Sequence, residues 1–221
     1  MIAAYHFVFN DFLENTYILS DESGECIIID PGCYYENERE DLKKFIVGKN
    51  LHPVLLLLTH AHIDHILGVK WVKETFNIPL MMNKDELFLF NNAGTIAKMY
   101  GLHADPPPAP DKFLQEGDQI KFGNSFLQAI FTPGHSPASM SFLAEKENFI
   151  ISGDVLFQSS IGRTDLPGGD YETLMQSIFN KLLVLPEETV VYSGHGPATN
   201  IGEEKRTNPF ILEFAETVRK L

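Results

Sequence analysis

The chain has 221 residues, of which 44% are hydrophobic and 21% are charged, a composition typical of a globular domain rather than a fibre or a disordered segment. Its 17 basic and 30 acidic side chains give a formal net charge of −13, which argues against nucleic acid as the main ligand. The sequence has no apolar run long enough to cross a bilayer and does not begin with a secretory signal pattern. We therefore expect one domain over residues 1–221, a cytoplasmic location and no membrane partner.

The first half of the chain alternates predicted strands and helices. In chain order we expect strands over 16–19 and 26–30, a helix over 36–49, a strand over 54–58, a helix just beyond residue 65, a strand over 79–82 and a helix over 84–100. The run 54–58 is apolar throughout, which is typical of a strand buried on both faces. Strand, loop and helix therefore follow one another directly around the histidines at 60–65.

The second half repeats this order after a proline-rich stretch at 105–110, which predicts a stiff extended connection. We expect strands over 119–122, 126–131, 140–144, 149–152 and 190–193, and helices over 171–183 and 203–221. Strands inside and helices outside predict a layered α/β domain.

Three histidines and an aspartate cluster directly after the most apolar strand. His60, His62, Asp64 and His65 supply nitrogen and oxygen donors of borderline hardness, which suit zinc, iron, manganese or cobalt rather than calcium or magnesium. A loop of crowded imidazoles without a metal would be poorly tolerated once the rings become protonated. The sequence therefore predicts a transition-metal site here.

Three further segments also follow apolar strands and contain small residues that let the chain turn. They carry His135, Asp154 and His195. Taken singly, each histidine is more often a hydrogen-bonded loop residue than a ligand, and Asp154 is more often a turn or helix-cap residue. Since α/β folds build their sites at strand ends on one edge of a sheet, we expect all five histidines and both aspartates to form one composite metal centre.

The order His60-x-His62-x-Asp64-His65, His135, Asp154, His195 resembles the metallo-β-lactamase superfamily. The resemblance implies a single-domain α/β fold, an αββα four-layer sandwich. It also implies two divalent metal ions, one held by His60, His62 and His135, the other by Asp64, His65 and His195, with Asp154 bridging them. Zinc is the first expectation, and iron and manganese are the alternatives. Asp30 would orient a ligand histidine or, as a second interpretation, would only form an Asp-Pro-Gly turn.

Within the superfamily the chain is similar to short bacterial glyoxalase II enzymes through the segments 161–167 and 194–197. This similarity implies hydrolysis of a small, glutathione-linked thioester, although only 26 residues follow His195, too few for the helical domain of long glyoxalases II. Aspartate at position 64 argues against a true β-lactamase. The run from Gly162 to Asp165 also resembles iron-dependent glutathione persulfide dioxygenases. A metal-binding module without turnover is the third class.

In the hydrolase hypothesis, hydroxide bridging the two ions attacks the thioester carbonyl, so the ion ligands Asp64 and Asp154 are the expected catalytic carboxylates. Arg163 is the candidate for binding a substrate carboxylate, with a brace to Asp165 as the alternative. Cys26 and Cys33 form no CxxC motif, and we expect both to be structural thiols. The sequence leaves the oligomeric state open.

Overall fold

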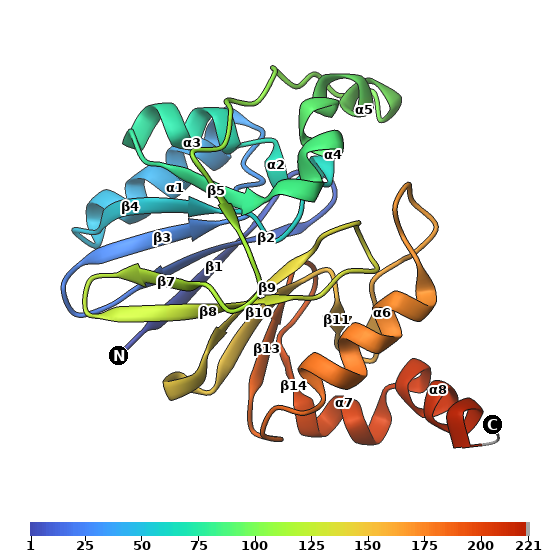
Figure 1. Ribbon diagram of the computed structural model, residues 1–221. Helices are drawn as coiled ribbons and strands as arrows, with labels where there is room; N and C mark the ends of the chain where they lie inside the picture. The colour runs from blue at the N-terminus through green and yellow to red at the C-terminus, as the bar shows by residue number, and fades with distance from the viewer. Residues whose placement is uncertain (220–221) are drawn as a thin grey trace.

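The computed structural model describes residues 1–219, which form two six-stranded sheets packed face to face, with helices on both outer surfaces and a small two-stranded ribbon (Figure 1). This arrangement confirms the expected αββα sandwich. The first sheet has its strands in chain order: β1 (Ala3–Phe9), β2 (Glu14–Ser20), β3 (Glu25–Ile29), β4 (His52–Leu57), β5 (Leu80–Asn83) and β6 (Lys112–Leu114). It is antiparallel up to β3 and parallel from β3 to β6.

The second sheet is mostly antiparallel. Its spatial order is β14 (Thr199–Asn200), β13 (Val190–Ser193), β10 (Phe149–Gly153), β9 (Met140–Ala144), β8 (Ser125–Phe131) and β7 (Gln119–Phe122). The pair β10 and β13 is parallel. The ribbon consists of β11 (Leu156–Phe157) and β12 (Ser160–Ile161). Because β10 and β13 run in the same direction, the loops that follow them lie at the same edge of the sheet.

Helices cover the two outer faces. They are α1 (Glu36–Gly48), α2 (Ile63–Ile66), α3 (Val69–Phe76), α4 (Leu87–Asn91), α5 (Ala93–Met99), α6 (Tyr171–Ser177), α7 (Ile201–Thr207) and α8 (Pro209–Arg219), with short turns η1 (Lys84–Glu86), η2 (Glu145–Glu147) and η3 (Ile178–Leu182). In Figure 1, α1 and α3 lie on the first sheet, whereas α6 and α7 lie beside the second. None of these helices within residues 1–219 is both long and apolar enough to cross a membrane.

Alternation along the strands explains the layers. In β3, Ile28 packs in the cluster under the outer helices, while its neighbours Ile27 and Ile29 pack in the cluster between the sheets. In β10, Ile150 packs beneath the helices of the second face and Ile151 packs between the sheets. Both sheets therefore bury side chains on both faces, as the apolar run over 54–58 predicted for its own strand.

The sequence did not predict some of the strands, and it predicted wrong bounds for several helices. Strands β1, β6, β11, β12 and β14 were not expected, and the helix expected over 84–100 is divided into η1, α4 and α5. The helix expected just beyond residue 65 instead begins at Ile63, so Asp64 and His65 lie inside α2. The expected helix is also interrupted between α2 and α3, at Gly68, whose amide donates to the Pro31 carbonyl at 2.7 Å.

The helix expected over 203–221 is in fact two helices, α7 and α8, and residues 220–221 lie outside the described range. Asn208 ends α7 in an extended conformation, which is the conformation favoured before a proline such as Pro209. Its side-chain amide donates to Glu204 Oε2 at 2.8 Å and to the Ser160 carbonyl at 3.0 Å. Tertiary contacts therefore stabilise the break that the proline begins.

Candidate metal centre

The predicted site residues meet at one edge of the sandwich, between the two sheets. His60 and His62 lie on the loop after β4, and His135 lies on the loop after β8. Asp154 directly follows β10, and His195 follows β13. A hydrogen bond from the Met140 amide to the Thr59 carbonyl, 2.8 Å long, joins the first sheet's ligand loop to the second sheet. The edge is thus built by both halves of the chain.

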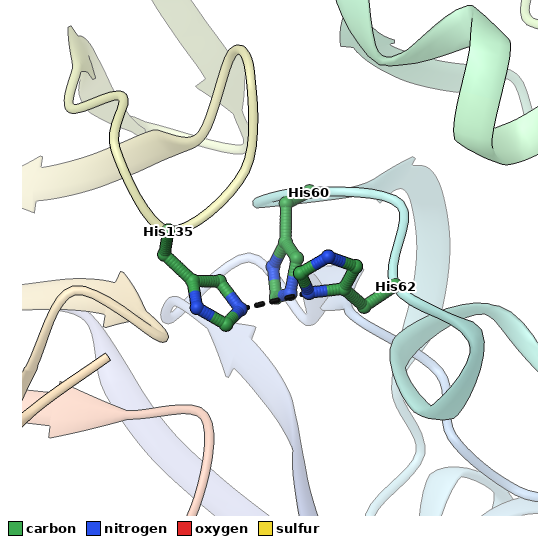
Figure 2. A group of neighbouring side chains, drawn as sticks. All are labelled: His60, His62 and His135. Atoms are coloured by element: carbon green, nitrogen blue, oxygen red, sulfur yellow. Dashed lines mark hydrogen bonds between the residues drawn. The ribbon is translucent and has the colours of Figure 1, made fainter. Parts of the chain in front are cut away.

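His60, His62 and His135 form the first group of potential ligands. Their candidate ligand atoms all lie within 4.8 Å of one another. Figure 2 shows His60 and His62 on one loop and His135 reaching toward them from the facing loop. The closest pair of ring nitrogens is His62 Nδ1 and His135 Nε2, at 2.8 Å.

Neighbouring groups fix which nitrogen of each ring is free to bind a cation. The Thr59 hydroxyl donates to Asp30 Oδ2 at 2.5 Å, so it accepts a hydrogen bond from His60 Nδ1, 2.9 Å away. His135 Nδ1 donates to the carbonyl oxygen of Arg163 at 2.8 Å. In both rings Nε2 is therefore left with its lone pair directed into the group.

Asp64, His65 and His195 form the second group. His195 Nε2 lies 3.1 Å from Asp64 Oδ2, and His65 Nε2 lies 3.6 Å from the same oxygen. His195 Nδ1 faces the carbonyl oxygens of Phe12 and Leu13 at 3.0 and 3.2 Å, where it can only donate. The N-terminal hairpin therefore orients the last histidine of the site.

Asp154 lies between the two groups. Its Oδ1 is 3.4 Å from His65 Nε2, and its Oδ2 is 3.4 Å from His135 Nε2 and 3.5 Å from His195 Nε2. It thus has one carboxylate oxygen near the second group and the other near both. This is the placement that a bridging ligand requires.

Asp30 stands behind the second group. Its Oδ2 is 3.1 Å from His65 Nδ1, and its Oδ1 accepts the Thr59 amide at 2.7 Å. Its backbone has a φ of +50°, a left-handed conformation that costs energy outside glycine. Of the two interpretations of Asp30, these contacts favour the one in which it orients a histidine. Thr59, which directly precedes the histidine motif and links Asp30 to His60, was not expected to have a role.

Burial and charge set the protonation of these groups. Burial lowers the pKa of His60 well below its usual range and that of His62 to about 3, so both rings are neutral. Burial also acts to lower the pKa of His65, but the carboxylates of Asp154 and Asp64 outweigh it and raise that pKa. The charge of His65 in turn holds the pKa of Asp154 below its usual range despite burial.

Within residues 1–219, six buried side-chain polar atoms lack a hydrogen-bond partner, and four of them belong to the expected metal ligands. The four are His60 Nε2, His62 Nε2, His65 Nε2 and Asp154 Oδ1. An unsatisfied buried polar atom costs roughly 1–3 kcal/mol, so such a concentration is unfavourable unless another group binds there. Neutral imidazoles and ionised carboxylates are the ligands that transition metals prefer. The donor set therefore fits a two-metal site.

Part of each group lines a cavity of about 630 Å³, in which His62, His135, Asp64, His195 and Asp154 form the polar floor. Its walls are largely apolar, and include Phe12, Leu89, Ile96, Tyr100, Phe157 and Ile161. Phe12 comes from the loop between β1 and β2, and the others come from α4 and the region of α5 and from the segment around β11 and β12. A small organic substrate fits such a cavity with its reacting atoms at the polar floor.

Arg163 lines the cavity, and its guanidinium forms two hydrogen bonds of 2.7 Å to the carboxylate of Asp165. Both side chains are largely exposed, at 58% and 68%. The structure thus contains the Arg163–Asp165 brace, which the sequence left as the alternative to a substrate contact. It also gives the backbone of Arg163 a contact that was not expected, the hydrogen bond to His135.

The two cysteines lie where the sequence placed them, Cys26 in β3 and Cys33 in a loop. Both are buried and neither is in a disulfide. Burial raises the pKa of each thiol, that of Cys26 to about 12. Neither therefore has the accessible thiolate that a nucleophile needs.

A family model described as the metallo-beta-lactamase superfamily matches residues 10–195, and the chain belongs to this family. The probable metallo-hydrolase YqgX of Bacillus subtilis is 41% identical over 201 residues, covering 90% of this chain and 92% of that protein. Hydroxyacylglutathione hydrolase GloC of Haemophilus influenzae is 39% identical over 202 residues, covering 90% and 93%. The family makes this chain a metallo-hydrolase in the broad sense.

Solved structures agree with this assignment. The crystal structure of BLEG-1 B3 metallo-beta-lactamase has a TM-score of 0.87 and 39% identity, covering 95% of this chain and 99% of that one. The structure of TTHA1623 in a di-iron-bound form has a TM-score of 0.83 and 38% identity, covering 93% and 99%.

Proposed function

We propose that the chain hydrolyses small thioesters with two bound divalent cations, and that a hydroxyacyl thioester of glutathione is its substrate. The observation that carries the proposal is the convergence of two ligand groups and Asp154 at the floor of one cavity. The identity to GloC supports the choice of thioester.

In this proposal each of the expected ligands keeps the role that the family resemblance implied. His60, His62 and His135 would hold the first ion, Asp64, His65 and His195 would hold the second, and Asp154 would be a ligand of both. When bound, such a pair of cations lowers the pKa of a water between them to about 7 and so supplies hydroxide at neutral pH. The chain itself needs no serine or cysteine nucleophile.

The two carboxylates of the proposal act by staying ionised. The charge of His65 and hydrogen bonds from neighbouring histidines outweigh burial and lower the pKa of both Asp64 and Asp154, so each stays ionised near neutral pH and can bind a cation. A thiol has a pKa of about 8.5, so a thiolate leaves without strong acid help. This fits a cavity floor whose groups include the ionised carboxylates of Asp64 and Asp154 and the neutral ring of His62.

Arg163 is the proposed contact for a carboxylate of the thiol carrier. Its ion pair with Asp165 is exposed, and exposed pairs contribute only about 0–1 kcal/mol. A substrate carboxylate can therefore replace Asp165 at little cost and use the same two guanidinium donors. The apolar walls would hold the acyl group.

An iron-dependent glutathione persulfide dioxygenase is the second candidate, favoured by a first group that is complete on its own and could hold a single ion. A metal-binding module without turnover is the third. We propose zinc as the resident metal, with iron or manganese as the alternatives. The net charge of −13 supports a small-molecule partner over nucleic acid, and the two unpaired cysteines support a cytoplasmic location.

The test uses the purified chain loaded separately with zinc, iron or manganese. Thiol release from a lactoylglutathione thioester, oxygen uptake with glutathione persulfide and cleavage of a chromogenic β-lactam are measured for each preparation. We expect thiol release to be the fastest reaction. Oxygen uptake without thioester cleavage would instead select the dioxygenase, and no turnover of any substrate would select the binding module.

A matched histidine control separates loss of the site from general damage. His135→Ala should abolish thiol release, because it removes a ligand of the first group. His103→Ala should leave it unchanged, because that side chain is 82% exposed and belongs to neither ligand group.

A further inference from the structure

Glu86 is a buried carboxylate that the proposed reaction does not use. It ends η1, directly after β5, and it is fully buried. Its Oε2 accepts the amide of Ala61 at 2.9 Å. Its Oε1 accepts the Ser136 hydroxyl at 2.7 Å and the amide of Ala138 at 2.8 Å.

These donors belong to the two loops that carry the first ligand group. Ala61 stands between His60 and His62, and Ser136 directly follows His135. The two loops follow strands of different sheets and face each other across the site (Figure 2). One carboxylate therefore joins the backbones of both loops beside the point where their imidazoles converge.

The chemistry of the three contacts requires a group that only accepts hydrogen bonds. The two amides can only donate. The Ser136 hydroxyl lies 2.6 Å from the Ser139 hydroxyl, whose proton it can accept while it donates its own to Glu86. A glutamine at position 86 would turn its NH₂ group toward one of these donors and leave a buried amide unsatisfied.

We propose that Glu86 is a positioning residue that sets the distance between the two ligand loops and so builds the first metal-binding group. The inference rests on the metal site of the proposed function. Glu86 itself binds neither ion nor substrate. It fixes the positions of His60, His62 and His135 through backbone and hydroxyl contacts next to them.

The effect should be confined to the first group. Asp30 orients His65, and the carbonyls of Phe12 and Leu13 orient His195, so the second group has its own supports. Losing a contact that orients metal ligands typically lowers metal affinity 10- to 100-fold. We therefore expect Glu86→Gln to weaken one of the two sites by about this factor and the other hardly at all.

Glu204 provides a matched control on the other side of the second sheet. It is also fully buried and also accepts three hydrogen bonds, from the Ser159 amide at 2.9 Å, the Thr199 hydroxyl at 2.5 Å and the Asn208 side chain at 2.8 Å. None of these donors is next to a proposed ligand. Glu204→Gln should therefore lower thermal stability as much as Glu86→Gln does without changing zinc affinity.

The experiment titrates the metal-free protein with Zn²⁺ in competition with a chromophoric chelator, and records the melting temperature of each metal-free variant. Glu86→Gln is made in three backgrounds: the natural sequence, His135→Ala and His195→Ala. With His135 removed, Glu86→Gln should cause no further loss, because the first group is already broken. With His195 removed, it should weaken the zinc that remains 10- to 100-fold.

Equal zinc affinities for Glu86→Gln and the natural sequence would overturn the inference, and so would an equal loss in both histidine backgrounds or the same loss in Glu204→Gln. If Glu86→Gln does not fold, Ser136→Ala, which removes one of the three donors, should still weaken the first site, and an unchanged affinity there would also overturn the inference. The proposed function fails separately: the natural sequence would then bind zinc as described but release no thiol.

Discussion

Gly194 lies where a single added methyl group would reach the centre of the site. A Cβ at this position would be 2.0 Å from Asp154 Oδ1 and 2.7 Å from His65 Cε1. The backbone cannot easily move away, because the Gly194 amide donates to the Gly153 carbonyl at 2.9 Å and its carbonyl accepts the Asn15 amide at 2.7 Å. Gly194→Ala should therefore displace Asp154.

The size of the effect follows from this geometry. An ordinary contact of a Cβ begins at 3.4 Å, so Asp154 Oδ1 must move by about 3.4 − 2.0 = 1.4 Å. A misplacement of 1 Å in a reacting arrangement costs on the order of 100-fold in rate. We expect Gly194→Ala to lower kcat/KM for the thioester at least 100-fold and to weaken binding of the second ion.

The assay combines thiol release with metal content per chain, and Gly196→Ala serves as the control on the same loop. A Cβ at Gly196 would meet no atom within 4 Å, although its φ of +70° is unfavourable for alanine. It should cost about 1–2 kcal/mol of stability while both ions stay bound. If Gly194→Ala kept full activity and both ions, the proposed position of Asp154 between two cations would be refuted.

Three further changes test other parts of the account. Arg163→Ala should raise KM for a glutathione thioester more than it lowers kcat, measured by steady-state kinetics, and an unchanged KM would leave Arg163 only its brace to Asp165. His195→Ala should nearly abolish thioester hydrolysis, since it removes a ligand of the second ion; full activity in that variant would rule out the two-metal mechanism. Hydrogen bonds from Ser23 and Asn124 outweigh burial and lower the pKa of Asp21 below 3.8, so the stability that this carboxylate provides above about pH 4 should be lost as the pH falls through its native pKa. Asp21→Asn should therefore flatten the acid branch of a plot of unfolding free energy against pH, and an unchanged branch would contradict that role.

Strands and helices whose hydrophobic pattern is visible in the local sequence could be predicted, whereas elements that depend on tertiary contacts could not. The run over 54–58 is apolar at every position, so its burial on two faces could be predicted without tertiary information. Strand β1 has an irregular burial pattern at the edge of its sheet, and its pairing with β2 is what makes it a strand. The break at Asn208 likewise depends on contacts with Ser160, which is far away in the sequence.

In the candidate site, too, some residues could be predicted from the local sequence and others could not. The proposed ligands follow strands and stand beside small residues, so each could be identified locally and their convergence inferred from the layer architecture. Thr59 and Glu86 could not be found in this way, because their roles depend on atoms that only folding brings near. Glu86 is 50 residues from Ser136 in the sequence, and Glu86 itself belongs to no motif.

The most direct test of the account counts and locates the ions. A crystal structure of the metal-loaded protein, with diffraction recorded on both sides of the zinc, iron and manganese absorption edges, identifies each ion by its anomalous signal. We predict two ions, one contacting His60, His62 and His135, and both contacting Asp154. A protein that takes up no transition metal, or binds it away from these side chains, would contradict the central claim.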